Sequence, residues 1–186
     1  MHDHETAMYH FGKDQAECNV HLIRYLTKNT EETGNLWSKE LSDLLLTMNL
    51  ERQEKISVGV TSFSETELSK YEAEYDKIIT KGREEHKKTR GKCAYKEETA
   101  LLNRLVKYKK NHLLFLYDFD VEFSNNMSER DLRKGKNRQK MSGGFRKLSG
   151  IEMYCIIMSI IETCKRKKML LFENIQKIFN GTPAIF

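Results

Sequence analysis

The sequence predicts a mainly α-helical protein with one or two short strands, and three observations support that fold class. The 186 residues include one proline and 10 glycines, so few positions interrupt a helix. Apolar residues recur at helical spacing along several stretches of the chain. A hydrophobic share of 39% beside 32% charged residues indicates a globular chain that is long enough to bury a core.

The first predicted elements are a short strand at residues 15–20 and a helix at residues 21–30. The apolar positions of this helix follow helical spacing: Leu22, Ile23 and Leu26. Gly34 and Asn35 come next, and these residue types commonly follow the end of a helix.

Two long amphipathic helices are predicted next, and such helices commonly pair with each other. In the first, one apolar stripe runs along the helix: Trp37, Leu41, Leu44, Leu45 and Met48. The second begins at Ser64, because Ser64 and Glu67 match the capping-box pattern. Its apolar stripe continues at helical steps: Leu68, Tyr71, Tyr75, Ile78 and Ile79.

The second half of the chain is predicted to alternate helices with polar connections. Residues 81–96 are rich in Lys, Arg, Glu and Gly and lack an apolar face, so we expect a mobile connection or a frayed helix end. Residues 118–126 are predicted to form an irregular turn, in which Asp118 and Asp120 serve as loop and cap residues. Helices are predicted for the remaining segments: residues 97–112, 127–136, 151–164 and 171–179.

Neither a membrane span nor a signal peptide is predicted. No apolar run approaches the ~20 residues that a transmembrane helix needs, and the N-terminus lacks the basic-then-apolar layout of a signal peptide. We therefore expect a cytoplasmic protein with reduced cysteines. Cys18 and His21 form a C-x-x-H pair, which is half of a zinc site without a visible second half, so zinc is not predicted.

The net charge of +5 is unevenly distributed along the chain. Residues 1–80 contain 8 Lys and Arg against 15 Asp and Glu, whereas residues 81–186 contain 24 against 12. A basic second half suggests a polyanionic partner such as nucleic acid, although a basic surface can also be simply solvated.

Glu129 is the most informative acidic residue. Asn125 and Asn126 suit the start of a helix, because their side chains accept hydrogen bonds from free backbone N–H groups. Glu129 then lies in the first turn, with Arg130 beside it and Arg133 one turn further along roughly the same face. The alternative interpretation is a surface Glu–Arg pair, which contributes less than about 1 kcal/mol.

Downstream of Glu129, residues 130–147 hold eight cations and a single acidic residue, Asp131. The turn at residues 142–144, Ser-Gly-Gly, adds exposed backbone amides. Cations and free amides are the groups that contact phosphates, and they give affinity for a nucleic-acid backbone without sequence specificity. The residues expected to contact DNA are Arg130, Arg133, Lys136, Arg138, Lys140 and Arg146.

Several motifs together resemble the insertion sequence 66 family of transposases, and the resemblance spans nearly the whole chain. Residues 124–133, SNNMSERDLR, are similar to the family pattern N-N-x-x-E-R-x-L-R, and residues 136–146 are similar to K-x-K-x-S-G-x-F-R. Residues 2–4 resemble the family's H-D-H segment, and residues 17–24 resemble its C-N-x-H-x-x-R segment.

The resemblance implies a bacterial enzyme with an RNase H-like core and an Asp-Asp-Glu triad that holds divalent metal. Asp3 matches the second Asp and Glu129 matches the Glu, so both are expected to be catalytic residues and ligands of Mg²⁺ or Mn²⁺. Residues 1–33 would belong to the core, residues 34–113 would be a helical insertion, and residues 114–186 would return to the core. The expected partner is the DNA of transposon ends.

The family's first catalytic Asp would lie upstream of Met1, so the expected fold is a truncated RNase H-like DDE core. The chain would then be the C-terminal part of a DDE transposase, with little or no cleavage activity alone. Helices left without their sheet would expose apolar faces. One alternative is a non-catalytic protein that binds DNA, a full-length transposase or a second copy of itself. Another is a helical interaction module with a merely solvated basic half.

Overall fold

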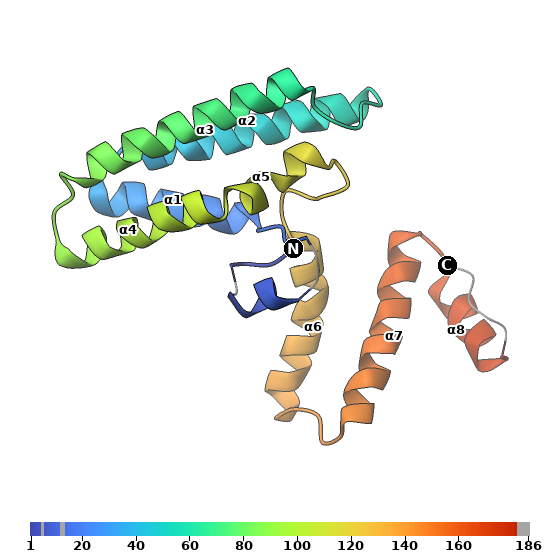
Figure 1. Cartoon of the computed structure of the whole chain (residues 1–186). Helices are drawn as coiled ribbons and strands as arrows, with labels where there is room; N and C mark the ends of the chain where they lie inside the picture. Colours follow the sequence, from blue (N-terminus) through green and yellow to red (C-terminus); the bar gives the residue numbers. More distant parts are fainter. Residues whose placement is uncertain (5, 12–13, 182–186) are drawn as a thin grey trace. The chain divides into compact units, whose positions relative to one another are not determined.

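The computed structural model describes residues 1–4, 6–11 and 14–181 (Figure 1). In these residues the secondary structure consists of eight α-helices and one short 3-10 helix, Thr6–His10. The described ranges contain no strand and no RNase H-like sheet. An isolated parallel β-bridge joins His2 and Glu17. The fold class is therefore mainly α, as predicted, without the expected α+β remnant.

The predicted strand at residues 15–20 is wrong, because its last two residues, Asn19 and Val20, already belong to the first helix. Two tertiary hydrogen bonds fix the helix start at Asn19. The Asn19 backbone N–H donates to the Phe123 carbonyl at 3.1 Å, and Asn19 Nδ2 donates to the His112 carbonyl at 2.9 Å. Contacts so distant in sequence override local strand propensity.

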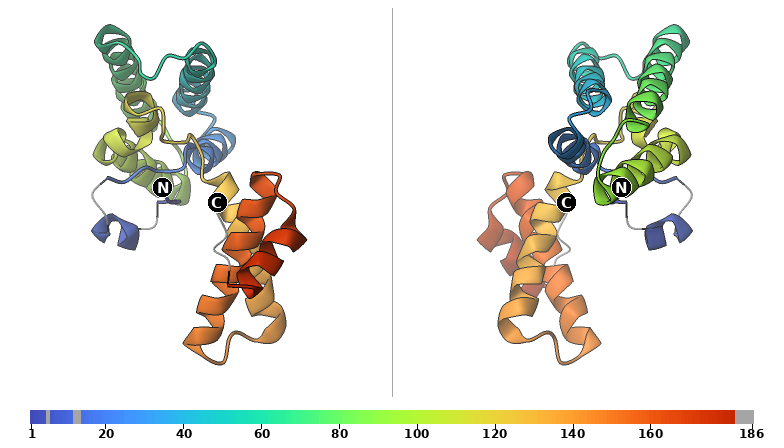
Figure 2. Two further views of the ribbon diagram at one scale, coloured as in Figure 1. Left: turned by 90° about the vertical axis from the view of Figure 1, so that its right-hand side faces the viewer. Right: turned by 90° about the vertical axis from the view of Figure 1, so that its left-hand side faces the viewer.

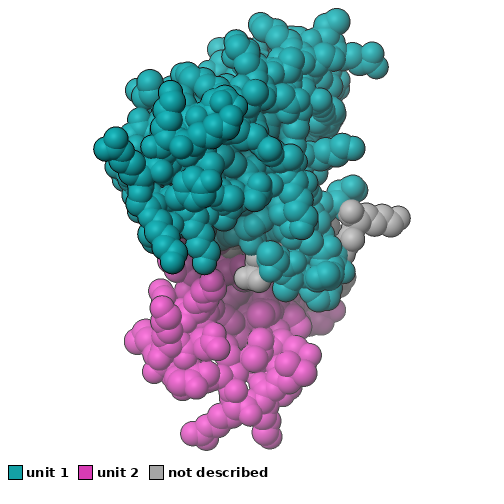
Figure 3. All heavy atoms as spheres, turned by 60° about the vertical axis from the view of Figure 1, so that its left-hand side comes forward, with its two compact units in different colours: residues 1–125 teal, residues 126–186 magenta. Residues whose placement is uncertain are grey.

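The chain forms two compact units, residues 1–125 and residues 126–186 (Figure 3). The first unit contains α1 (Asn19–Thr33), α2 (Trp37–Ser57), α3 (Glu65–His86), α4 (Lys92–Lys107) and α5 (Lys109–Tyr117). The second unit contains α6 (Asn126–Ser142), α7 (Leu148–Arg166) and α8 (Leu171–Phe179).

Helices α1 to α4 form a four-helix bundle in which successive helices alternate in direction (Figures 1 and 2). Each helix packs against the next one in the chain, and α4 closes the ring by packing against α1. The connections are short, as is usual between antiparallel neighbours. The pairing expected for the two long amphipathic helices is confirmed, because α2 packs against α3.

The predicted apolar stripes form the core of this bundle. The fully buried side chains include Leu22 and Leu26 of α1, Trp37, Leu41, Leu45 and Met48 of α2, and Tyr75 of α3. Gly82 of α3 makes room for the indole ring of Trp37, because a Cβ at Gly82 would lie 2.8 Å from the Trp37 Cδ2 atom. Helices α2 and α3 therefore approach each other closely at Gly82.

The helix boundaries agree with several signals in the sequence. Gly34 follows α1 with a φ of 74°, and the predicted capping box of Ser64 and Glu67 is present at the start of α3. The prediction for residues 81–96 is wrong in most of its length, since α3 continues to His86 and α4 begins at Lys92. In place of an apolar face, a buried polar network holds these two helix ends.

The centre of that network is the fully buried carboxylate of Glu98. Its Oε1 atom accepts hydrogen bonds from Trp37 Nε1 (2.7 Å), Asn35 Nδ2 (2.7 Å) and Asn29 Nδ2 (3.2 Å). Its Oε2 atom accepts from Thr89 Oγ1 at 2.5 Å and lies 2.8 Å from His86 Nδ1. Burial alone would raise the pKa of Glu98, but these hydrogen bonds outweigh it and lower the pKa to about 2.

In the second unit, two ion pairs join α6 and α7. Lys134 Nζ lies 2.5 Å from Glu162 Oε1, and Arg166 forms an ion pair with Asp131. Residues of both helices line a cavity of about 620 Å³. Among the described side chains of this unit, those of Cys164 and Asn174 are buried, while the others are at least partly exposed.

Candidate functional site

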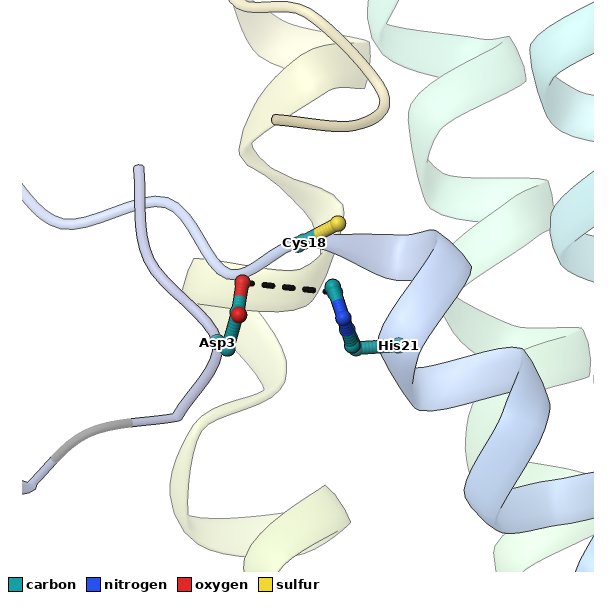
Figure 4. A group of neighbouring side chains, drawn as sticks. All are labelled: Asp3, Cys18 and His21. Atoms are coloured by element: carbon teal, nitrogen blue, oxygen red, sulfur yellow. Dashed lines mark ion pairs between the residues drawn. The ribbon is translucent and has the colours of Figure 1, made fainter. Parts of the chain in front are cut away.

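The N-terminal segment that carries Asp3 is held against the start of α1. The His2 N–H donates to the Ala16 carbonyl at 3.0 Å, and the Cys18 N–H donates to the His2 carbonyl at 3.0 Å. These bonds place Asp3 beside the first turn of α1, where Asp3 Oδ1 lies 3.3 Å from His21 Nδ1 (Figure 4).

Asn125, at the end of the first unit, contacts the same group of side chains. Its Nδ2 atom donates to Asp3 Oδ1 at 2.6 Å, and its backbone N–H donates to Cys18 Sγ at 3.4 Å. Asp3, Cys18 and His21 each present a donor atom, and these atoms lie within 4.8 Å of one another. Sequence reasoning identified Cys18 and His21 as half a site but could not place Asp3 beside them.

Glu17 anchors the N-terminal segment to α4 and α5. Its buried carboxylate accepts hydrogen bonds from Tyr9 and Arg104, and it lies 2.9 Å from His4 Nδ1 and 3.1 Å from His112 Nε2. Burial would raise the pKa of Glu17, but the contact with His112 and the hydrogen bonds from Tyr9 and Arg104 hold the pKa well below its ordinary range. Sequence reasoning assigned no role to Glu17, because its partners are distant in sequence.

The structure places Glu129 in the first turn of α6, which begins at Asn126, as predicted. Its side chain is half-buried. Asp118 also behaves as predicted, since its Oδ1 accepts the Asp120 N–H at 2.9 Å within the turn between α5 and α6. Asp3 belongs to the first unit and Glu129 to the second, so their joint action as metal ligands stays a prediction.

The six cations assigned to DNA contact are all exposed and lie on α6 or in the loop after it. Arg133, Lys136 and Lys140 follow Glu129 by four, seven and eleven residues, so all three share its face of the helix. Across the described part of the chain, none of the six forms an ion pair with an acidic residue. Their charges are therefore available to an external anion.

The donor atoms of Asp3 and Glu129 fit a hard divalent cation, since carboxylate oxygens are the ligands that Mg²⁺ and Mn²⁺ prefer. The Asp3 side chain is 43% exposed, so an ion in solution can reach it. This carboxylate contacts both His21 and Asn125 through Oδ1.

Residues 6–153 match the sequence profile described as Transposase IS66 family. The chain belongs to this family. The matched region includes Glu129 and all six candidate DNA-binding cations, whereas Asp3 precedes it. A search among curated proteins and a search among solved structures found no match.

Membership of the IS66 transposase family gives the chain a role related to DNA transposition and implies interaction with DNA. The DDE transposases of this family are typically metal-dependent. No described helix is both long and apolar enough to span a membrane.

Proposed function

We propose that this IS66 family chain binds the DNA of transposon ends through α6 and contributes Asp3 and Glu129 to a metal-dependent site for cleavage and strand transfer. The observation that carries the proposal is the position of Glu129 at the start of α6, followed along the same face by Arg133, Lys136 and Lys140. A lone surface Glu–Arg pair would not need that continuous row of exposed cations.

The row of cations is suited to a DNA backbone in length as well as charge. From Glu129 to Lys140 the helix rises roughly 16 Å, which corresponds to about five nucleotide steps of 3.4 Å. A strand lying along this face would be held by its phosphates and would bring one phosphodiester to Glu129. Arg130, Arg138 and Arg146 lie outside this row and would contact neighbouring phosphates.

Asp3 and Glu129 would hold the Mg²⁺ or Mn²⁺ ions. When bound, such ions activate a water or a 3′-hydroxyl and neutralise the leaving oxygen of the phosphodiester. Asn125 and His21 would orient the Asp3 carboxylate through Oδ1 while its second oxygen faces the ion. In this proposal residues 1–33 and 114–186 form the catalytic part, and residues 34–113 form an insertion.

Fluorescence anisotropy with labelled duplex DNA over a range of salt concentrations tests the binding face. Substitution of Arg133, Lys136 and Lys140 by Gln should weaken binding and reduce the slope of log affinity against log salt by about 3, since each phosphate contact contributes about 0.9. The matched control replaces three exposed lysines of the first unit, Lys39, Lys70 and Lys88, by Gln. An equal loss in both variants would contradict the proposed face.

Nicking of supercoiled DNA in the presence of Mn²⁺ tests the role of Glu129. If the wild-type chain nicks DNA and Glu129→Gln does not, the catalytic assignment is supported. If Glu129→Gln nicks DNA as well, the assignment is contradicted. DNA binding with little or no metal-dependent nicking is expected both of a transposase part that is inactive alone and of the alternative function, a non-catalytic DNA-binding protein. That alternative is supported by the same exposed cations without any catalytic role for Asp3 or Glu129.

A further inference from the structure

Three potential metal ligands of different chemistry meet where the N-terminal segment reaches α1. Asp3 comes from the segment, Cys18 immediately precedes the helix, and His21 lies in its first turn (Figure 4). Their donor atoms lie within 4.8 Å of one another. Ligand atoms of a tetrahedral zinc site lie roughly 3.5 Å apart, given bonds of about 2.0–2.3 Å. Small side-chain rotations would therefore bring the three donors to bonding distance of a shared ion.

We propose that Asp3, Cys18 and His21 bind a divalent transition-metal ion of the zinc class. A thiolate sulfur and an imidazole nitrogen beside a carboxylate oxygen form a donor set that suits zinc, whereas magnesium and calcium prefer oxygen alone. Binding would release the Cys18 thiol proton to solvent, because the thiolate is the ligand. The site goes beyond the proposed function, since it involves a different ion and requires neither DNA nor cleavage.

The C-x-x-H spacing places both α1 ligands at the N-terminal end of the helix. Cys18 is the N-cap residue, with extended backbone (φ −72°, ψ 108°), and its side chain makes no capping hydrogen bond. The thiol is therefore not occupied with the helix backbone. The positive end of the helix dipole also favours anionic ligands such as a thiolate and a carboxylate.

Asn125 supplies an independent indication that these side chains form a built site. It contacts two of the three ligands, since its backbone N–H donates to Cys18 Sγ and its Nδ2 donates to Asp3 Oδ1. Its own Oδ1 is buried and has no hydrogen-bond partner among the residues that the structure describes. Such supporting contacts orient ligands in metal sites.

Asp3 can bind an ion at this site and also serve as a ligand in the proposed catalytic site. A carboxylate can bind one ion through each oxygen, and here Oδ1 is the atom nearest His21. An ion at Cys18 and His21 would fix the position of Asp3 against α1. Its role would therefore be to hold the N-terminal segment in place.

Titration of the reduced, metal-free full chain with Co²⁺ tests this site, because a cobalt–thiolate bond produces a characteristic charge-transfer absorption. We expect one equivalent to bind with this absorption and to be displaced by Zn²⁺ but not by Mg²⁺. Cys18→Ser should remove the absorption, and His21→Gln should weaken binding strongly. Asn125→Ala should weaken it by about 10-fold, as is usual for a residue that supports the ligands.

Cys93→Ser is the matched control, because Cys93 is exposed and lies in α4. Circular dichroism of every variant establishes that it is folded. If Cys18→Ser does not fold, the loss of cobalt binding in His21→Gln tests the site instead. No cobalt–thiolate absorption in the wild type, or an absorption that persists in Cys18→Ser, overturns the proposal. Cobalt binding by a chain that fails to bind DNA would leave this site standing while the proposed function falls.

Discussion

The two compact units bury their apolar side chains to very different degrees. In residues 1–125, the side chains of Trp37, Leu41 and Leu45 are fully buried in the four-helix bundle. In residues 126–186, Leu132 is 64% exposed and Phe172 is 79% exposed. Burial of apolar surface stabilises a fold by about 25 cal/mol per Å², so the first unit gains far more from its own core than the second.

The helices of the first unit therefore form a bundle with its own apolar core, whereas the helices of the second unit leave apolar side chains exposed. Exposed apolar faces, which the sequence led us to expect of helices without a sheet to cover, occur on α7 and α8. The exposed cations of α6 lie in the same unit. The part of the chain with the weakest core is therefore also the part that carries the candidate DNA contacts.

A matched pair of leucine substitutions should give the largest contrast between the units. Leu45→Ala should lower the free energy of unfolding by about 4 kcal/mol, because it leaves a cavity in the bundle core. Leu132→Ala should change it by less than about 0.5 kcal/mol, because that side chain is mostly exposed. Urea unfolding followed by fluorescence of Trp37, the single tryptophan, measures the first unit, and circular dichroism follows the whole chain. An equal loss of free energy of unfolding in the two variants would contradict the difference in burial between the two units.

Glu98→Gln should destabilise the bundle by about 3 kcal/mol at neutral pH, because donors that the carboxylate satisfies would lose their charged acceptor. The pKa of Glu98 is about 2 in the fold against an ordinary 4.5, so its contribution is present above pH 4.5 and is lost as the pH falls toward 2.

The difference between wild type and Glu98→Gln should therefore shrink over that pH range. Urea midpoints from Trp37 fluorescence at several pH values measure it. A difference that stays constant down to pH 2 would show that Glu98 does not carry this acid sensitivity.

Two glycine substitutions sharpen the comparison further. Gly82→Ala should cost about 2 kcal/mol, because the added Cβ would lie 2.8 Å from Trp37 and overpack the contact between α2 and α3. Gly135→Ala in α6 should instead stabilise its helix by roughly 0.5–1 kcal/mol, because its nearest neighbour, Tyr154, would be 3.8 Å away. Thermal melts of both variants test the pair, and a stabilising Gly82→Ala would refute the close approach.

The smallest effect is expected for Lys134→Ala, which removes the exposed ion pair to Glu162 between α6 and α7. Solvent screens such pairs, so the loss should be smaller than those expected for the substitutions of Leu45, Glu98 and Gly82. It should disappear at roughly 1 M salt, where the screening length is about 3 Å. Melts followed by circular dichroism at low and high salt measure it. A large loss that is independent of salt would mean that the two helices depend on this contact.

The helices were largely predictable from the sequence because their signals are local. The stripe from Trp37 to Met48 and the capping box at Ser64 depend on residues only a few positions apart, and the structure confirms both. The same holds for Glu129 in the first turn of α6.

The errors in prediction arose where distant residues decide the structure. Residues 81–96 lack an apolar face, yet His86 is buried because Glu98 lies beside it. The start of α1 depends on Phe123, and the neighbourhood of Asp3 depends on Asn125. Periodicity and spacing carry no information on such pairs, so the cluster of Asp3, Cys18 and His21 could not be assembled from the sequence.

The hydrogen bond between Asn125 and Asp3 has a consequence for the order of events during synthesis. Asp3 leaves the ribosome well before Asn125, which follows 122 residues later in the chain. The ring of helices can close only when α4 packs against α1, and the contacts of Glu17 with α4 and α5 form only after Arg104 and His112 are made. Asp3 is thus translated long before the residues that complete its native surroundings.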